Sequence, residues 1–136
     1  MNILAQVLAA VSAMVVGFIW YNPKTFGNAW MSGVGMTEEK MASGNMAVRY
    51  GLAILMAFII SVFVGFVGGG HTEEVLPRWQ HFAYHGGQLA LVMVAPILVI
   101  VSLFEQLDFK TILINVSYWV VTLTAMGAII GAMPAG

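Results

Sequence analysis

Four apolar runs, each about as long as a bilayer is thick, limit most strongly how this chain can fold. They cover residues 3–21, 46–67, 82–104 and 111–132. A helix over the shortest run is roughly 28 Å long, close to the ~30 Å hydrocarbon core. None of the runs alternates between polar and apolar residues as a strand of a membrane barrel would. Because backbone groups in lipid must be paired within their own segment, the sequence predicts an all-α integral membrane bundle of four transmembrane helices.

Composition narrows the class of protein further. Of the 136 residues, 60% are hydrophobic and only 8% are charged, against about 25% charged in a soluble domain. This length predicts one domain over residues 1–136, in contact with the lipid bilayer. A net charge of −1 and the lack of a basic block argue against a nucleic-acid partner. The chain has no cysteine, which excludes disulfides and thiolate metal sites.

The segment GFIWYNPKTFGNAW marks the point where the first helix reaches the membrane surface. Trp20 and Tyr21 have amphipathic rings suited to that boundary, and Pro23 cannot continue a helix. Phe26 and Trp30 stand four residues apart, on one face of a short helix. The chain is therefore expected to stop at the surface and lay an aromatic face along it.

The connections between the runs differ in length and charge. In the first connection Thr37 is placed to start a short helix, and Ser43 or Asn45 to cap the second span. The third connection is short, so the last two spans should form an antiparallel hairpin. Lysine and arginine set the orientation, since they favour the cytoplasmic side. Lys24, Lys40, Arg49 and Lys110 lie beside the first and third connections, and only Arg78 lies in the second. This bias predicts a protein of the cytoplasmic (inner) membrane with both termini outside, on the side opposite the cytoplasm.

Small residues recur every four positions on two spans, and a Gly-x-x-x-Gly pair occurs on the last. Such stripes let helix backbones approach closely, which matters because lipid provides no hydrophobic drive for association. They can pack within one subunit or between copies of the chain, and we expect a homo-oligomer. The stripes are Ala5, Ala9, Ala13 and Gly17; Ala53, Ala57, Ser61 and Gly65; and Gly127 with Gly131.

Polar groups inside spans are the candidates for function. Near the outer surface Gln6 belongs to the first span, and His85 and Gln88 share a face of the third. We expect these three side chains to meet in a polar pocket or an interhelical contact, because unpaired polar groups in hydrocarbon cost several kcal/mol. Pro96, further along the third span, removes the hydrogen bond to the Val92 carbonyl and is expected to bend the helix.

His81 and His85 are also four residues apart, a spacing that offers two nitrogens to one metal ion. This pattern is a weak signal, because it lacks a third ligand unless His71 or Glu74 supplies one. Haem would need histidines on facing helices, and only the third span has any. No metal or cofactor is therefore predicted.

Near the cytoplasmic surface Arg49, Glu105, Asn115 and Tyr118 form a second candidate cluster. Arg49 either snorkels to the surface or pairs with Glu105 or Asp108. Asn115 and Tyr118 either bond between helices or line a transport path. No nucleophile with a base, carboxylate pair or phosphate loop is present, so no enzymatic activity is expected.

Two stretches carry a resemblance to a known family: WYNPKTFGNAW near the start and SLFEQLDFKTILINVSYWVVTLTAMGAII near the end. With His85-Gly86, they resemble the membrane proteins of domain of unknown function family 1761, a bacterial family. The resemblance covers nearly the whole chain and implies a four-helix membrane protein, without an activity or substrate.

Two functions are consistent with these residues. The first is a structural or accessory membrane subunit, whose partner would be a second copy or another membrane protein. The alternative is a small-solute transporter or channel around His85 and Gln88. A transporter should have a polar cavity at the bilayer centre, whereas an accessory subunit should be filled by small and apolar side chains.

Overall fold

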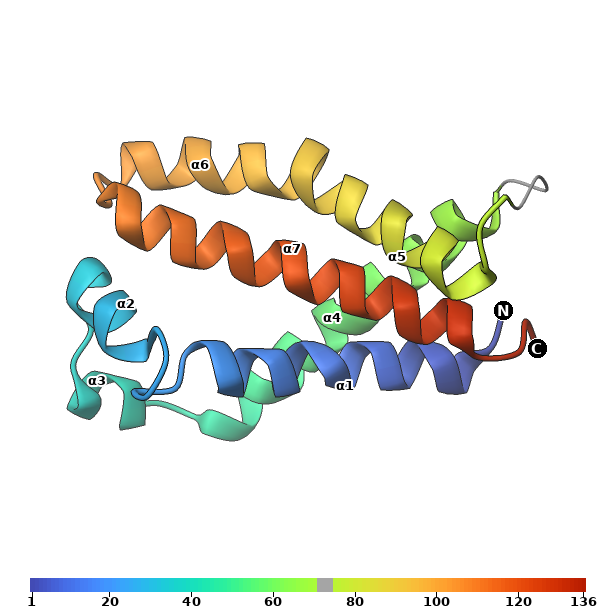
Figure 1. Cartoon of the computed structure of the whole chain (residues 1–136). Helices are drawn as coiled ribbons and strands as arrows, with labels where there is room; N and C mark the ends of the chain where they lie inside the picture. The colour runs from blue at the N-terminus through green and yellow to red at the C-terminus, as the bar shows by residue number, and fades with distance from the viewer. Residues whose placement is uncertain (71–74) are drawn as a thin grey trace.

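The computed structural model describes residues 1–70 and 75–136, and every regular element in those ranges is helical (Figure 1). Four spans are long and apolar enough to cross a membrane, which confirms the predicted fold class. Both chain ends lie at the same end of the bundle, where the Asn2 side chain donates to the Pro134 carbonyl over 3.0 Å. The elements are α1 (Ile3–Trp20), α2 (Gly27–Val34), α3 (Glu38–Ala42), α4 (Met46–Gly69), α5 (Arg78–Leu89), the π-helical segment η1 (Ala90–Val94), α6 (Ala95–Phe104) and α7 (Phe109–Ala132).

Side-chain caps fix where four of the helices begin. In each case an oxygen of the cap accepts the backbone N–H three residues further on, which pairs one of the free donors of the first turn. The predicted caps Thr37 and Asn45 are confirmed for α3 and α4. Asn2 and Asp108 cap α1 and α7 in the same way.

The third span differs in detail from the prediction. It begins at Arg78 rather than at residue 82 and continues through η1 and α6 to Phe104. Pro96 has no N–H for the Val92 carbonyl. The helix accommodates this by widening over η1, and the Ala95 N–H bonds the Ala90 carbonyl five residues back. Phe104 then leads into a short turn, and α6 and α7 form the predicted antiparallel hairpin.

The helix α7 is the centre of the bundle and packs on α1, α4, α5 and α6. Its glycines allow close contact with α5: a Cβ on Gly131 would lie 2.6 Å from the Arg78 carbonyl oxygen. Gly127 lies against the Phe82 backbone, and Gly86 of α5 lies against the Leu123 backbone. This Gly-x-x-x-Gly pair therefore packs inside one subunit.

The small-residue stripes of α1 and α4 also pack within the subunit. Ala5, Ala9 and Ala13 are each 1% exposed or less. Ser61 on α4 is fully buried and its hydroxyl donates to the Gln6 carbonyl of α1 over 3.1 Å. These contacts confirm the expectation that the two stripes face an interior.

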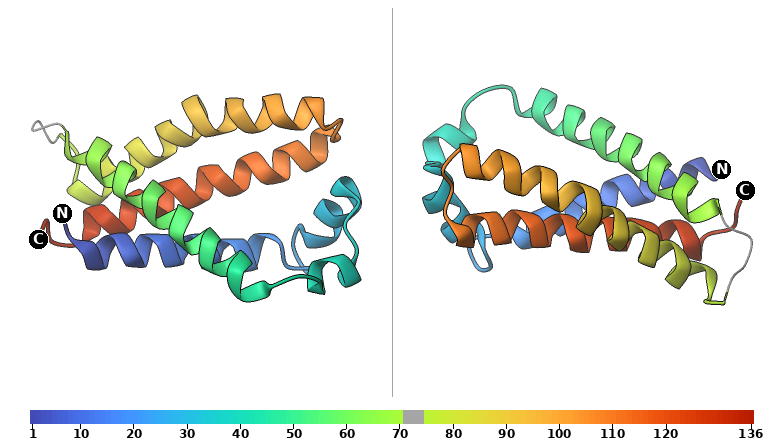
Figure 2. Two further views of the ribbon diagram at one scale, coloured as in Figure 1. Left: turned by 180° about the vertical axis from the view of Figure 1, so that it is seen from behind. Right: turned by 90° about the horizontal axis from the view of Figure 1, so that it is seen from above.

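The first half of α4 lacks such contacts. Both views in Figure 2 show it leaning away from α6 and α7. From Met46 to Met56 no residue is buried, and only Ala53 is partly covered. The second half, from Ala57 onward, contributes Ala57, Ser61, Val64 and Gly68 to the interior. One span thus belongs to the bundle over half of its length only.

Candidate functional site

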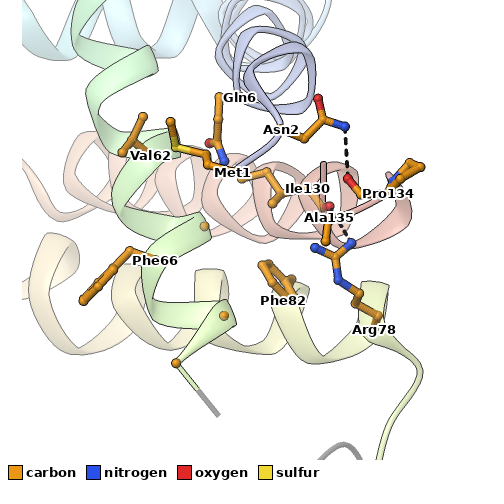
Figure 3. Close-up of a pocket in the computed structure, with 13 residues that line it drawn as sticks. Met1, Asn2, Gln6, Val62, Phe66, Arg78, Phe82, Ile130, Pro134 and Ala135 are labelled. Atoms are coloured by element: carbon orange, nitrogen blue, oxygen red, sulfur yellow. Dashed lines mark hydrogen bonds between the residues drawn. The ribbon is translucent and has the colours of Figure 1, made fainter. Parts of the chain in front are cut away.

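A groove of about 420 Å³ lies at the end of the bundle that holds both termini (Figure 3). It is formed where α1 and α5 begin and where α4 and α7 end. Its walls are mainly apolar, and three polar side chains line it: Gln6 of α1, Arg78 of α5 and Asn2, which caps α1. The apolar lining includes Val62, Phe66, Phe82 and Ile130.

Gln6 lies at the inner side of this groove. It is 2% exposed, and its Oε1 has no hydrogen-bond partner among the described residues. Gly65 makes room for the amide, because a Cβ there would stand 2.6 Å from the Gln6 Nε2 atom. A buried acceptor without a donor is rare in folded proteins and costs about 1–3 kcal/mol. Gln6 is therefore the least satisfied polar group of this groove.

Arg78 holds the outer side of the groove. Its Nη1 atom donates to the carbonyls of Ile130 (3.2 Å) and Gly131 (3.0 Å), and also to that of Met133. These carbonyls end α7, where a cation is favoured by the helix dipole. The guanidinium carbon also lies 4.7 Å from the centre of the Phe82 ring. Among the described residues that line the groove, Arg78 is the only one with a charged side chain.

His85 and Gln88 line a second, smaller groove of about 260 Å³ beside Val67 and η1. The His85 ring is half-buried, 4.6 Å from the His81 ring and 5.6 Å from the Tyr84 ring, centre to centre. His81 Nε2 is within 3.1 Å of the Gly68 carbonyl oxygen. Gln88 is exposed and its Nε2 donates to the Tyr84 hydroxyl over 3.2 Å.

The expectation that Gln6 joins His85 and Gln88 is therefore wrong. The helix α5 packs on α7 through Phe82 and Gly86, and the next position at this spacing, Ala90, is also buried. That contact turns Gln88 outward, because it lies about 200° around the helix from Gly86. Gln6 instead meets Gly65 and Ser61 on α4.

A metal at His81 and His85 stays a hypothesis. Among the described residues no group of three His, Cys, Asp or Glu side chains is placed to hold an ion. His71 and Glu74, the suggested third ligands, lie outside the described residues.

The four residues of the second candidate cluster, Arg49, Glu105, Asn115 and Tyr118, do not form one site in the described part of the chain. Arg49 donates to the carbonyls of Met41 (2.8 Å) and Ser43 (2.9 Å), so it closes the turn before α4. Glu105 is exposed at the end of α6. The loop carbonyls satisfy the guanidinium locally, which removes the need for a carboxylate from α6.

Asn115 and Tyr118 do come together, and they do so through Tyr21, for which the sequence predicts only a place at the membrane surface. The Tyr21 hydroxyl donates to Asn115 Oδ1 over 2.8 Å, and its ring lies 5.3 Å from the Tyr118 ring. The Tyr118 hydroxyl donates to the Ala13 carbonyl over 2.8 Å. Trp20 Nε1 adds a bond to the Ile114 carbonyl over 3.1 Å. These contacts fasten the end of α1 to α7 and leave both aromatic hydroxyls paired.

Sequence comparison places the chain in a family. The family model described as "Protein of unknown function (DUF1761)" matches residues 4–131, nearly the whole chain. The chain belongs to the DUF1761 family. This result confirms the resemblance found in the WYNPKTFGNAW and SLFEQLDFK stretches, and it assigns no activity. No curated protein and no solved structure shows significant similarity to this DUF1761 chain.

Proposed function

We propose that this DUF1761 protein is a non-catalytic structural or accessory subunit of the cytoplasmic membrane, with both termini outside, and that it works as a homo-oligomer. The observation that carries the proposal is the first half of α4, where no residue between Met46 and Met56 is buried. A helix at the lipid-facing side of a bundle still buries one stripe against its neighbours. This half-span buries none, so a second protein surface is needed to give it one.

The centre of the bundle supports an accessory role over transport. Its middle level is filled mainly by small and apolar side chains, with Ala9, Ala13, Val64, Leu123 and Met126 each 1% exposed or less, and the hydroxyls of Ser61 and Thr122 are fully buried among them. A transport path would need a polar cavity at that depth. Because these residues occupy the space, we place the functional surface on the outside of the subunit.

A second copy is the partner that we favour for the first half of α4. Small residues permit close helix approach in lipid, and this segment carries Gly51 and Ala53. A Cβ on Gly51 would meet no atom within 4 Å, so a neighbouring helix has free access to that backbone.

Light scattering of the detergent-purified protein tests the proposal. We expect the native chain to be a dimer or larger, and Gly51→Trp to shift it toward monomer, because the added ring blocks approach without a clash inside the subunit. Leu4→Trp is the matched control, since Leu4 is 59% exposed on α1. A native monomer, or equal behaviour of the two variants, would contradict self-association through α4.

A small-solute pathway beside His85 and Gln88 is the second candidate. It is favoured by η1, which lies directly beyond these residues, since π-helical turns are frequent at functional sites. Shrinkage of proteoliposomes in glycerol, urea and potassium chloride gradients measures it. Flux above that of empty vesicles that is lost in His85→Ala would favour this candidate over the accessory subunit.

A further inference from the structure

We propose that the groove at the terminal end of the bundle binds one anionic phospholipid with a hydroxyl-bearing headgroup, of the phosphatidylglycerol class. Its phosphate would lie at Arg78, a headgroup hydroxyl would reach Gln6, and an acyl chain would follow the apolar wall. The inference concerns the single subunit and does not depend on self-association.

The position of the groove matches that of a lipid headgroup and its first chain segments. The spans α1, α4, α5 and α7 all begin or end at this level. Inward from the ends, the groove is lined by Val62, Phe66 and Phe82. Phe66 is 75% exposed, so the groove is open toward the lipid. A ligand that enters from the bilayer would therefore present its polar end to Arg78.

The charge in the groove selects an anion. Among the described residues that line the groove, Arg78 is the only one with a charged side chain, and none of them has a carboxylate side chain. The hydrogen bonds of Arg78 to α7 all use Nη1. Figure 3 shows the other end of the guanidinium directed toward the groove. The planar guanidinium is suited to phosphate, because its donors match the geometry of two phosphate oxygens.

Gln6 adds a requirement that simple anions do not meet. Its Oε1 is buried and accepts no hydrogen bond from the described residues, so the site has a place for a donor. A glycerol headgroup has hydroxyl donors beside its phosphate. Phosphatidylcholine has the phosphate but no hydrogen-bond donor, and its fixed cation would oppose Arg78.

Glycine provides the room for an acyl chain. Gly69, the last residue of α4, and Gly70, its cap, both line the groove and have no side chain to fill it. A Cβ on Gly69 would meet no atom within 4 Å. The groove volume of about 420 Å³ also falls in the ~300–1,000 Å³ range of small-molecule sites.

Native mass spectrometry of the full chain in detergent tests the proposal with phosphatidylglycerol and phosphatidylcholine of identical acyl chains. We expect one phosphatidylglycerol bound about tenfold more tightly than phosphatidylcholine, because only phosphatidylglycerol has a headgroup hydroxyl to donate to Gln6, and one hydrogen bond to a buried acceptor allows a difference of that size. Glycerol 1-phosphate should not bind detectably, because it lacks the chain. Equal binding of the two lipids would overturn the proposal, as would binding of glycerol 1-phosphate as tight as that of phosphatidylglycerol.

Two variants locate the lipid. Gly69→Leu should fill the groove and reduce phosphatidylglycerol binding about tenfold, whereas Gly51→Leu, also a glycine in open space on α4, should leave it unchanged. Gln6→Leu should keep the fold and reduce the preference for phosphatidylglycerol over phosphatidylcholine. Thermal unfolding in detergent without lipid checks that each variant is folded. Undiminished binding in folded Gly69→Leu or an unchanged preference in Gln6→Leu would place the lipid elsewhere and contradict the proposal.

Discussion

The two ends of this bundle are held together by different means. At the terminal end, α5 and α7 touch backbone to backbone through Gly86, Gly127 and Gly131. At the loop end, α1 is fastened to α7 by aromatic side chains, with Tyr21 and Tyr118 at the centre. The first half of α4 shares in neither arrangement. This difference is the basis of the proposal that the loop end presents a surface for assembly.

Cysteine labelling that tests which end of the bundle faces outward should give an all-or-none result. We expect a cysteine at Gly136 to react with an impermeant thiol reagent on intact cells and one at Ser32 to be protected. The basis is the lysine and arginine bias, and the chain has no other cysteine to give background. Labelling at Ser32 alone would place the first half of α4 at the outer surface.

The same substitution in the two regions should have very different costs. Leu123→Ala should lower the free energy of unfolding by about 2–5 kcal/mol, because it leaves a cavity where the side chain is 1% exposed. Leu55→Ala, at a position 50% exposed on α4, should change it by about 0.5 kcal/mol or less in the monomer. Steric-trap or denaturant unfolding in detergent measures both. Similar losses would mean that α4 packs as fully at Leu55 as α7 does at Leu123.

The aromatic fastening of the loop end should contribute less. Tyr118→Phe removes the hydrogen bond to the Ala13 carbonyl and should cost about 0.6 kcal/mol, the average for bonds between membrane helices. Tyr50→Phe is the control, because the Tyr50 ring is 40% exposed on α4. A loss in the control as large as in Tyr118→Phe would show that the hydroxyl bond to α1 is not what fastens this end.

The smallest effect concerns the start of α7, outside the membrane span. The hydrogen bonds from the Thr111 hydroxyl and N–H lower the pKa of the Asp108 carboxyl. Because the folded pKa lies below the unfolded one, the stabilisation is present above the ordinary carboxyl pKa and is lost as the pH falls through the folded value. We expect a slightly lower unfolding temperature for Asp108→Ala at neutral pH, and a smaller difference from native in acid, where the protonated carboxyl keeps a capping oxygen but loses its charge. Asp108→Asn, which also retains a capping oxygen, should fall between them at neutral pH. A difference that is as large in acid as at neutral pH would assign the effect to something other than the carboxylate charge.

The sequence was sufficient for the parts that depend on local chemistry. Apolar length located the spans, capping residues such as Thr37 and Asn45 located helix starts, and small-residue spacing located the close contacts. The rotation of each helix could not be obtained in this way. Gly86 decides which face of α5 meets α7, and this contact turned Gln88 outward although it is polar.

Some of the predicted groups of polar residues do not form, for a related reason. Arg49 and Gln88 find partners nearby in the sequence, so neither needs the partner that was predicted for it on another helix. Arg78 could be counted as a charge, but its place in a groove depends on where α7 ends. A lone cation at the start of a span, opposite a polar residue in the first turn of another, is the signal that would have paired it with Gln6.

Oxidative cross-linking in native membranes tests most directly whether the first half of α4 is a subunit interface. The chain has no cysteine, so a disulfide-linked dimer of the chain can form only between the introduced cysteine and its copy in a second subunit. We expect Leu52→Cys, on the exposed half of α4, to give a disulfide-linked dimer with copper phenanthroline, and Leu4→Cys on α1 to remain monomeric. Their side chains are exposed to similar extents, 54% and 59%, so accessibility alone does not separate them. Monomer at both positions, or dimer at Leu4 alone, would contradict an interface on α4.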